Sequence, residues 1–89
     1  MKPHILVVDD EPDIRRLVRE ILEDEGYAVT VAKDGASARD AIATRTPSLV
    51  LLDIWMPDVD GISLLKEFLE KNHLRCPVIM MSGHGTVEA

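Results

Sequence analysis

Short apolar runs alternate along the chain with longer segments in which apolar residues recur every three or four positions. Four of the runs predict β-strands, at residues 5–8, 27–32, 49–52 and 78–81. Three of them are continuously apolar, which is typical of strands covered on both faces. Residues 27–32 instead alternate between more and less apolar positions, so this strand is expected at an edge of the sheet.

The longer segments predict three amphipathic helices. Pro12 suits the first turn of a helix and Gly26 is a stop signal, so the first helix lies between them. Asp34 is a good N-cap for the second helix, which ends before Pro47, and Gly61 precedes the third. The apolar positions of the helix faces are Ile14, Leu17, Val18, Ile21 and Leu22 in the first, Ala36, Ala38, Ala41 and Ile42 in the second, and Ile62, Leu65, Phe68 and Leu69 in the third.

Strands that alternate with helices imply right-handed parallel crossovers, and hence one α/β domain at residues 1–89 with a doubly wound sheet. One feature of the pattern stays open. Residues 78–81 are apolar on both faces, yet too little chain follows them to cover a strand or to pair with its outer edge. We therefore expect a missing C-terminal portion, a partner, or a homo-oligomer or domain-swapped dimer formed through this edge.

Composition narrows the classes of function. The chain carries 16 acidic against 10 basic residues, a formal net charge of -6, which argues against a nucleic-acid contact made by this segment. Cys76 is the only cysteine, so no intrachain disulfide can form, as is usual in a reducing compartment. No apolar run approaches membrane-spanning length and the N-terminus has no signal-peptide core, so we expect no membrane contact and a cytoplasmic location.

Acidic residues directly follow two of the predicted strands, Asp9 and Asp10 after the first and Asp53 after the third. Because the carboxyl ends of parallel strands meet at one edge of a sheet, these carboxylates should lie together and repel one another unless a cation binds among them. Mg²⁺ is the natural cation, and with its charge in place Asp53 can act as a nucleophile toward a phosphoryl group. The alternative is that the acids only cap the following helices, as Asp10 or Glu11 would before Pro12.

Three blocks of the sequence, at residues 7–11, 52–61 and 78–85, together resemble the receiver domain of two-component response regulators. The residues around Trp55 and His84 are most similar to nitrogen-regulation, sigma-54 activator receivers of the NtrX type. The resemblance implies a flavodoxin-like parallel sheet of strand order 2-1-3-4 with three helices, truncated after the fourth strand. It also implies a role in signal transduction and transcription regulation, through an output domain absent here.

The same resemblance assigns roles to individual residues. Asp53 would be the phosphoacceptor, which receives a phosphoryl group from a histidine kinase. Asp10 would bind Mg²⁺ directly, Asp9 through a water molecule, and Trp55 through its backbone carbonyl. Ser82 matches the small hydroxyl residue that hydrogen-bonds the phosphoryl group and carries the switch. Family members are not enzymes in the usual sense, although they assist their own phosphorylation and dephosphorylation.

Several family features would lie after residue 89: the fifth strand, the later helices, the lysine that pairs with the phosphoryl group, and an aromatic switch residue. We therefore predict that the chain retains Mg²⁺ but that its phosphorylation and signal output are impaired. A phosphorylation-incompetent, self-associating interaction module is the alternative. Residues 58–61 also resemble the acidic motif of haloacid-dehalogenase phosphatases, but they follow Met56 and Pro57 and not a buried strand.

Overall fold

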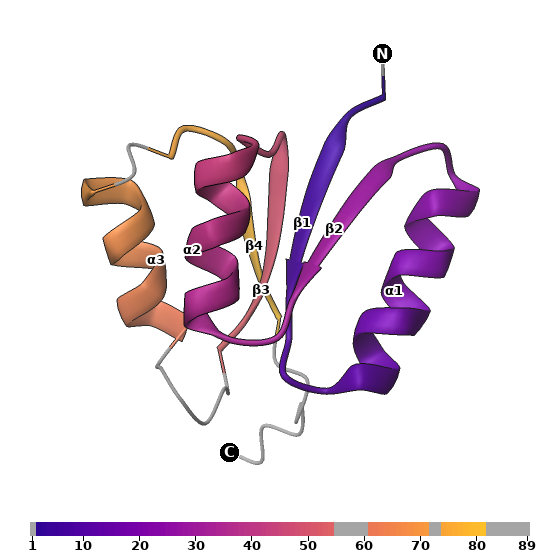
Figure 1. Cartoon of the computed structure of the whole chain (residues 1–89), viewed down its shortest axis with the longest axis horizontal. Helices are drawn as coiled ribbons and strands as arrows, with labels where there is room; N and C mark the ends of the chain where they lie inside the picture. The colour runs from indigo at the N-terminus through magenta and orange to yellow at the C-terminus, as the bar shows by residue number, and fades with distance from the viewer. Residues whose placement is uncertain (1, 55–60, 72–73, 82–89) are drawn as a thin grey trace.

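The computed structural model describes residues 2–54, 61–71 and 74–81, which fold into a parallel sheet with helices on both faces (Figure 1). The described residues form β1 His4–Val8, α1 Pro12–Asp24, β2 Ala28–Ala32, α2 Gly35–Thr44, β3 Leu49–Asp53, α3 Gly61–Glu70 and β4 Val78–Met81. All strand pairs are parallel, and the order across the sheet is β2-β1-β3-β4. The predicted flavodoxin-like α/β architecture is confirmed, with β2 at an edge.

The helix boundaries follow from the capping residues that the sequence predicted. Pro12 is the first residue of α1, and Gly26, two residues after its end, has a φ of 95°, which glycine adopts without the steric cost of a side chain. The Asp34 carboxylate caps α2 by accepting a hydrogen bond of 2.8 Å from the Ser37 N–H, and Ser37 Oγ accepts one from the Asp34 N–H. Within the described ranges, none of the helices has the length and apolarity needed to span a membrane.

The main core lies between the sheet and the pair of helices α2 and α3. It combines alternate strand residues with side chains from the two helices and the segment before β4: Leu6, Val8, Ala32, Ala38, Ile42, Val50, Leu52, Leu64, Phe68 and Leu74. The intervening positions of β1, Ile5 and Val7, face the other side of the sheet, where α1 packs on β1 and β2 (Figure 1). This layering places the carboxyl ends of β1 and β3 side by side.

Two apolar surfaces are less buried than the sequence pattern predicts. In β4, Ile79 is 51% and Met80 36% exposed, so among the described residues this strand is not covered on both faces, although its continuous apolar run is typical of covered strands. In α1, Leu17 and Ile21 are each 54% exposed. Because α1 packs on β1 and β2, whereas β4 lies at the opposite edge of the sheet beside β3, Ile79 and Met80 receive no cover from α1.

Candidate functional site

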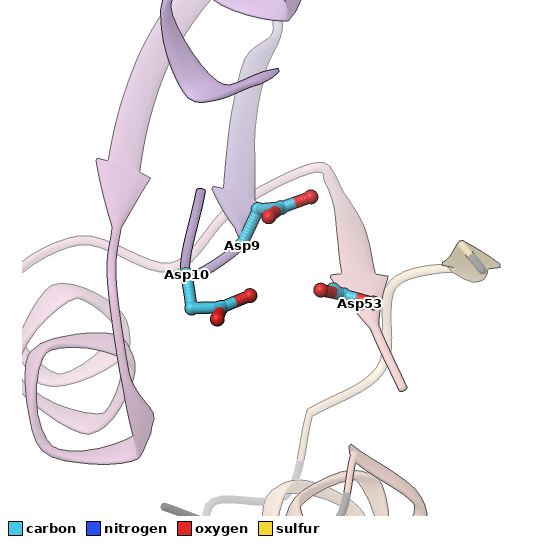
Figure 2. A group of neighbouring side chains, drawn as sticks. All are labelled: Asp9, Asp10 and Asp53. Carbon is cyan, nitrogen blue, oxygen red and sulfur yellow. The ribbon is translucent and has the colours of Figure 1, made fainter. Parts of the chain in front are cut away.

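Three aspartates gather at the carboxyl ends of β1 and β3 (Figure 2). Asp9 and Asp10 directly follow β1, and Asp53 is the last residue of β3, its neighbour in the sheet. One carboxylate oxygen of each residue lies within 4.8 Å of the corresponding oxygens of the other two. The structure therefore brings together the acids that the sequence places at two strand ends, and we call these three residues the acidic cluster.

Burial makes the charges of the acidic cluster costly. Asp9 is 1% exposed and Asp53 is fully buried, while Asp10 is half-buried. Burial raises the pKa of Asp9; the hydrogen bond from the Glu11 N–H lowers it in part, and the negative charges of Asp53, Asp10 and Glu11 raise it again. A cation bound among the three carboxylates would offset this cost.

The donor atoms of the acidic cluster match a hard divalent cation. All three are carboxylate oxygens, and Mg²⁺ is commonly held in proteins by one or two carboxylates together with water molecules and phosphate oxygens. Asp10 Oδ1 is buried and has no hydrogen-bond partner among the described residues, so its lone pairs are available to a ligand. The residues therefore fit Mg²⁺, which Asp9, Asp10 and Asp53 would hold.

The alternative role of these acids, as caps of the helix that follows, is not supported. Glu11 occupies the N-cap position of α1, but its side chain makes no capping hydrogen bond. The Asp9 carboxylate instead accepts the Glu11 N–H at 2.9 Å and so closes the turn between β1 and α1. The Asp10 side chain points toward Asp53 (Figure 2). The acids shape the cluster and its turn, and they do not cap α1.

Two residues to which sequence reasoning gave no role at the site contact the backbone of the acidic cluster. Arg15 Nη1 donates a hydrogen bond of 2.7 Å to the backbone carbonyl of Asp9. Gly61 begins α3 so close to β3 that a Cβ added there would lie 2.7 Å from the Asp53 carbonyl oxygen and 2.6 Å from the Ile54 Cα. The turn-forming composition of residues 58–61 was a signal for the glycine. The sequence holds no comparable signal for the arginine.

Some of the predicted site residues lie outside the described residues. They are Trp55, assigned to metal binding through its carbonyl, and Ser82, assigned to the switch. His84, which contributes to the resemblance to NtrX-type receivers and was given no role at the site, also lies outside the described residues. The roles given to Trp55 and Ser82 therefore stay predictions.

Comparison with known proteins identifies the family. A family model described as the response regulator receiver domain matches residues 5–89. The chain is similar to the nitrogen assimilation regulatory protein NtrX of Azorhizobium caulinodans, with 49% identity that covers 99% of this chain and 20% of that protein. It is also similar to the DNA-binding transcriptional regulator NtrC of Escherichia coli, with 38% identity over 96% of this chain and 18% of that protein. The chain thus spans about a fifth of the length of these relatives.

Solved structures agree with the sequence matches. The receiver domain of NtrX from Brucella abortus is 52% identical, with a TM-score of 0.80, and the match covers 91% of this chain and 68% of that one. The N-terminal domain of a response regulator receiver protein from Methanoculleus marisnigri is 35% identical, with a TM-score of 0.85 over 94% of this chain and 69% of that one. The predicted likeness to NtrX-type receivers is confirmed. Because sequence and fold agree over nearly the whole chain, it belongs to the response regulator receiver domain family, among receivers of the NtrX and NtrC type.

Proposed function

We propose that residues 1–89 form a phosphoacceptor receiver domain in which Asp53 accepts a phosphoryl group from a histidine kinase, with Mg²⁺ as the cofactor. The observation that supports this most directly is the acidic cluster, with carboxylate oxygens from two strands within 4.8 Å of one another. NtrC, a longer relative, is named a DNA-binding transcriptional regulator. The proposed output is therefore transcription regulation through a domain outside this segment.

Asp53 is the nucleophile in this proposal. As the last residue of a central strand and a fully buried side chain, it holds its carboxylate in a fixed direction, so little conformational freedom is lost on reaction. One carboxylate oxygen forms a bond to phosphorus while the bond between phosphorus and the kinase histidine nitrogen breaks, and that nitrogen takes up a proton. Bound Mg²⁺ supplies positive charge against the oxygens of the phosphoryl group.

In this proposal the remaining site residues bind the cation or respond to phosphorylation. Asp10 is the proposed direct ligand, because it is half-buried and its Oδ1 has no hydrogen-bond partner among the described residues. Asp9 acts through water, since its Oδ1 already accepts the Glu11 N–H. The Trp55 carbonyl is the proposed third protein ligand. Ser82 is the proposed switch hydroxyl, which hydrogen-bonds the phosphoryl group.

Metal binding is measured through Trp55, the only tryptophan in the chain. We expect Mg²⁺ to change its fluorescence in the wild type, and Asp10→Asn to weaken Mg²⁺ binding by about tenfold or more. Asp24→Asn is the matched control, because it removes the same charge from the exposed end of α1. If Asp10→Asn binds Mg²⁺ as tightly as the Asp24 variant, the acidic cluster is not the metal site.

Phosphorylation is measured by intact mass after incubation with acetyl phosphate and Mg²⁺. We expect partial labelling of the wild type and of Asp24→Asn, because the predicted impairment lowers its extent, and no labelling of Asp53→Asn. Labelling of the Asp53 variant at the wild-type level would contradict the proposed role of this residue. Impaired phosphorylation also stays a prediction, and normal labelling with a phosphorylation-dependent structural change would show it to be wrong.

A second candidate, a self-associating interaction module, is favoured by the exposed apolar residues of β4. Ile79 and Met80 are 51% and 36% exposed on a strand whose neighbour in the described sheet is β3. Such a strand can pair with a second copy of the chain. Sedimentation over a range of concentrations tests this candidate: association that Ile79→Lys weakens supports it, and a monomer at every concentration contradicts it.

A further inference from the structure

Arg15 lies near the start of α1, outside the acidic cluster, yet it contacts the backbone that carries two of the three acids. Its Nη1 donates a hydrogen bond of 2.7 Å to the Asp9 carbonyl oxygen. Hydrogen bonds with a charged donor are shorter and stronger than those between neutral groups. We propose that Arg15 is a positioning residue of the Mg²⁺ site, which fixes the peptide between Asp9 and Asp10 and hence the directions of both carboxylates. This assignment rests on the proposed function.

The other polar groups of Asp9 show what Arg15 adds. The Asp9 N–H donates to the Ala32 carbonyl at 3.0 Å and continues the pairing of β1 with β2. The Asp9 Oδ1 accepts the Glu11 N–H at 2.9 Å. These two hydrogen bonds fix the backbone N–H and the carboxylate of Asp9. The carbonyl held by Arg15 sets the orientation of the next peptide plane, from which Asp10 projects, so the contact acts on the proposed direct ligand.

Two neighbouring arginines provide an internal comparison. Arg16 and Arg19 line the same surface groove as Arg15. Their guanidinium groups pair with acids of α1 itself, Arg16 with Asp13 at 3.1 Å and Arg19 with Glu23 at 3.2 Å, and these exposed pairs contribute little to stability. Of the three arginines, Arg15 is the one whose hydrogen bond reaches the loop that carries the acids.

The sign of the effect separates positioning from charge. An arginine close to a cation site repels Mg²⁺, so by electrostatics alone the loss of the arginine strengthens Mg²⁺ binding. Loss of positioning weakens it, because the carboxylates no longer share one direction of approach to the ion. Outer contacts of this kind commonly change metal affinity by about tenfold or more when they are removed. The two explanations therefore predict opposite changes in affinity.

The test compares Mg²⁺ affinities by isothermal titration calorimetry for the whole chain and for Arg15→Ala, Arg16→Ala and Arg15→Lys. We expect Arg15→Ala to weaken binding by about tenfold, and Arg16→Ala to change it by less than about twofold, with any change toward tighter binding. Arg15→Lys keeps a donor and should recover part of the loss. In the metal-free protein, amide hydrogen exchange at Glu11 should be faster in Arg15→Ala and unchanged in Arg16→Ala.

Each outcome decides the assignment. The assignment is wrong if Arg15→Ala and Arg16→Ala both fold and their Mg²⁺ affinities lie within about twofold of one another. It is also wrong if Arg15→Lys binds Mg²⁺ as weakly as Arg15→Ala does. If Arg15→Ala does not fold, Arg15→Lys is compared with the wild type: a weaker affinity and faster Glu11 exchange support the assignment, and wild-type values for both overturn it. A wild type that binds no Mg²⁺ overturns the proposed function instead, and Glu11 exchange then still reports whether Arg15 orders the turn.

Discussion

Replacing Asp9 with asparagine should make the metal-free protein more stable, because it removes a buried charge from the acidic cluster. The Asp9 carboxylate lies within 4.8 Å of both Asp10 and Asp53. Two unit charges at this distance repel by roughly 3.5 kcal/mol at an effective dielectric constant of about 20, and by about 0.9 kcal/mol in water. Asparagine keeps an oxygen that can accept the Glu11 N–H. Since Asp10 is half-exposed, we expect a gain of about 1 to 3 kcal/mol in the free energy of unfolding.

Urea denaturation at neutral pH, with and without Mg²⁺, measures this gain. Mg²⁺ should stabilise the wild type by an amount that grows with its concentration, about 1.4 kcal/mol at ten times the dissociation constant, and should stabilise Asp9→Asn less. Asp24→Asn serves as the control, because it changes the net charge equally while leaving the acidic cluster intact. The control should show a change within about 0.5 kcal/mol of the wild type, as is usual for surface substitutions.

The pH dependence supplies a second check. The pKa of Asp9 is raised in the folded state, so the folded protein binds a proton there more readily than the unfolded chain does. The advantage of Asp9→Asn should therefore be complete at neutral pH and should shrink as the pH falls through the raised pKa, where protonation removes the same repulsion. A metal-free variant that is less stable than the wild type, or one that gains as much from Mg²⁺, would refute the reasoning.

Three further predictions concern the scaffold. Gly61→Ala should lower the free energy of unfolding by about 1 to 3 kcal/mol in urea titrations, since its Cβ would overlap the backbone of β3; an unchanged midpoint would contradict this. Asp34→Ala removes the cap of α2 and should cost about 1 kcal/mol by the same assay, whereas Asp40→Ala on the exposed face of α2 should cost less. Burial, aided by the charge of Arg45, lowers the pKa of His4, so the free energy of unfolding should fall as the pH drops below about 6.5, the ordinary pKa of histidine; a His4→Gln protein with the same pH dependence would exclude this residue as the cause.

Much of the fold could be predicted because its determinants are local. Pro12 and Asp34 set helix starts through their own backbone and side-chain chemistry, and the apolar runs give strands whatever their partners are. The exposure of Ile79 could not be predicted from such local signals. A run of apolar residues has the same pattern whether or not another element covers it, so its burial depends on the arrangement of distant segments.

For the candidate site, too, some features could be predicted from the sequence and others could not. The meeting of Asp9 and Asp53 could be predicted, because parallel strands carry their carboxyl ends to one edge of the sheet. The hydrogen bond from Arg15 could not, since three arginines occur within five positions and the sequence does not say which of them turns toward the loop. The clearance at Gly61 depends on the angle at which α3 meets β3, which no local pattern determines.

The contact between α3 and β3 also bears on how a structural change at Asp53, the proposed phosphoacceptor, would spread. A Cβ at position 61 would lie 2.7 Å from the Asp53 carbonyl oxygen, so the end of β3 and the first turn of α3 are packed too closely to shift independently. Leu64 and Phe68, one and two turns along that helix, are fully buried in the centre of the core. We therefore expect a displacement of the Asp53 backbone to shift the first turn of α3, and with it the side chains of Leu64 and Phe68 in the core.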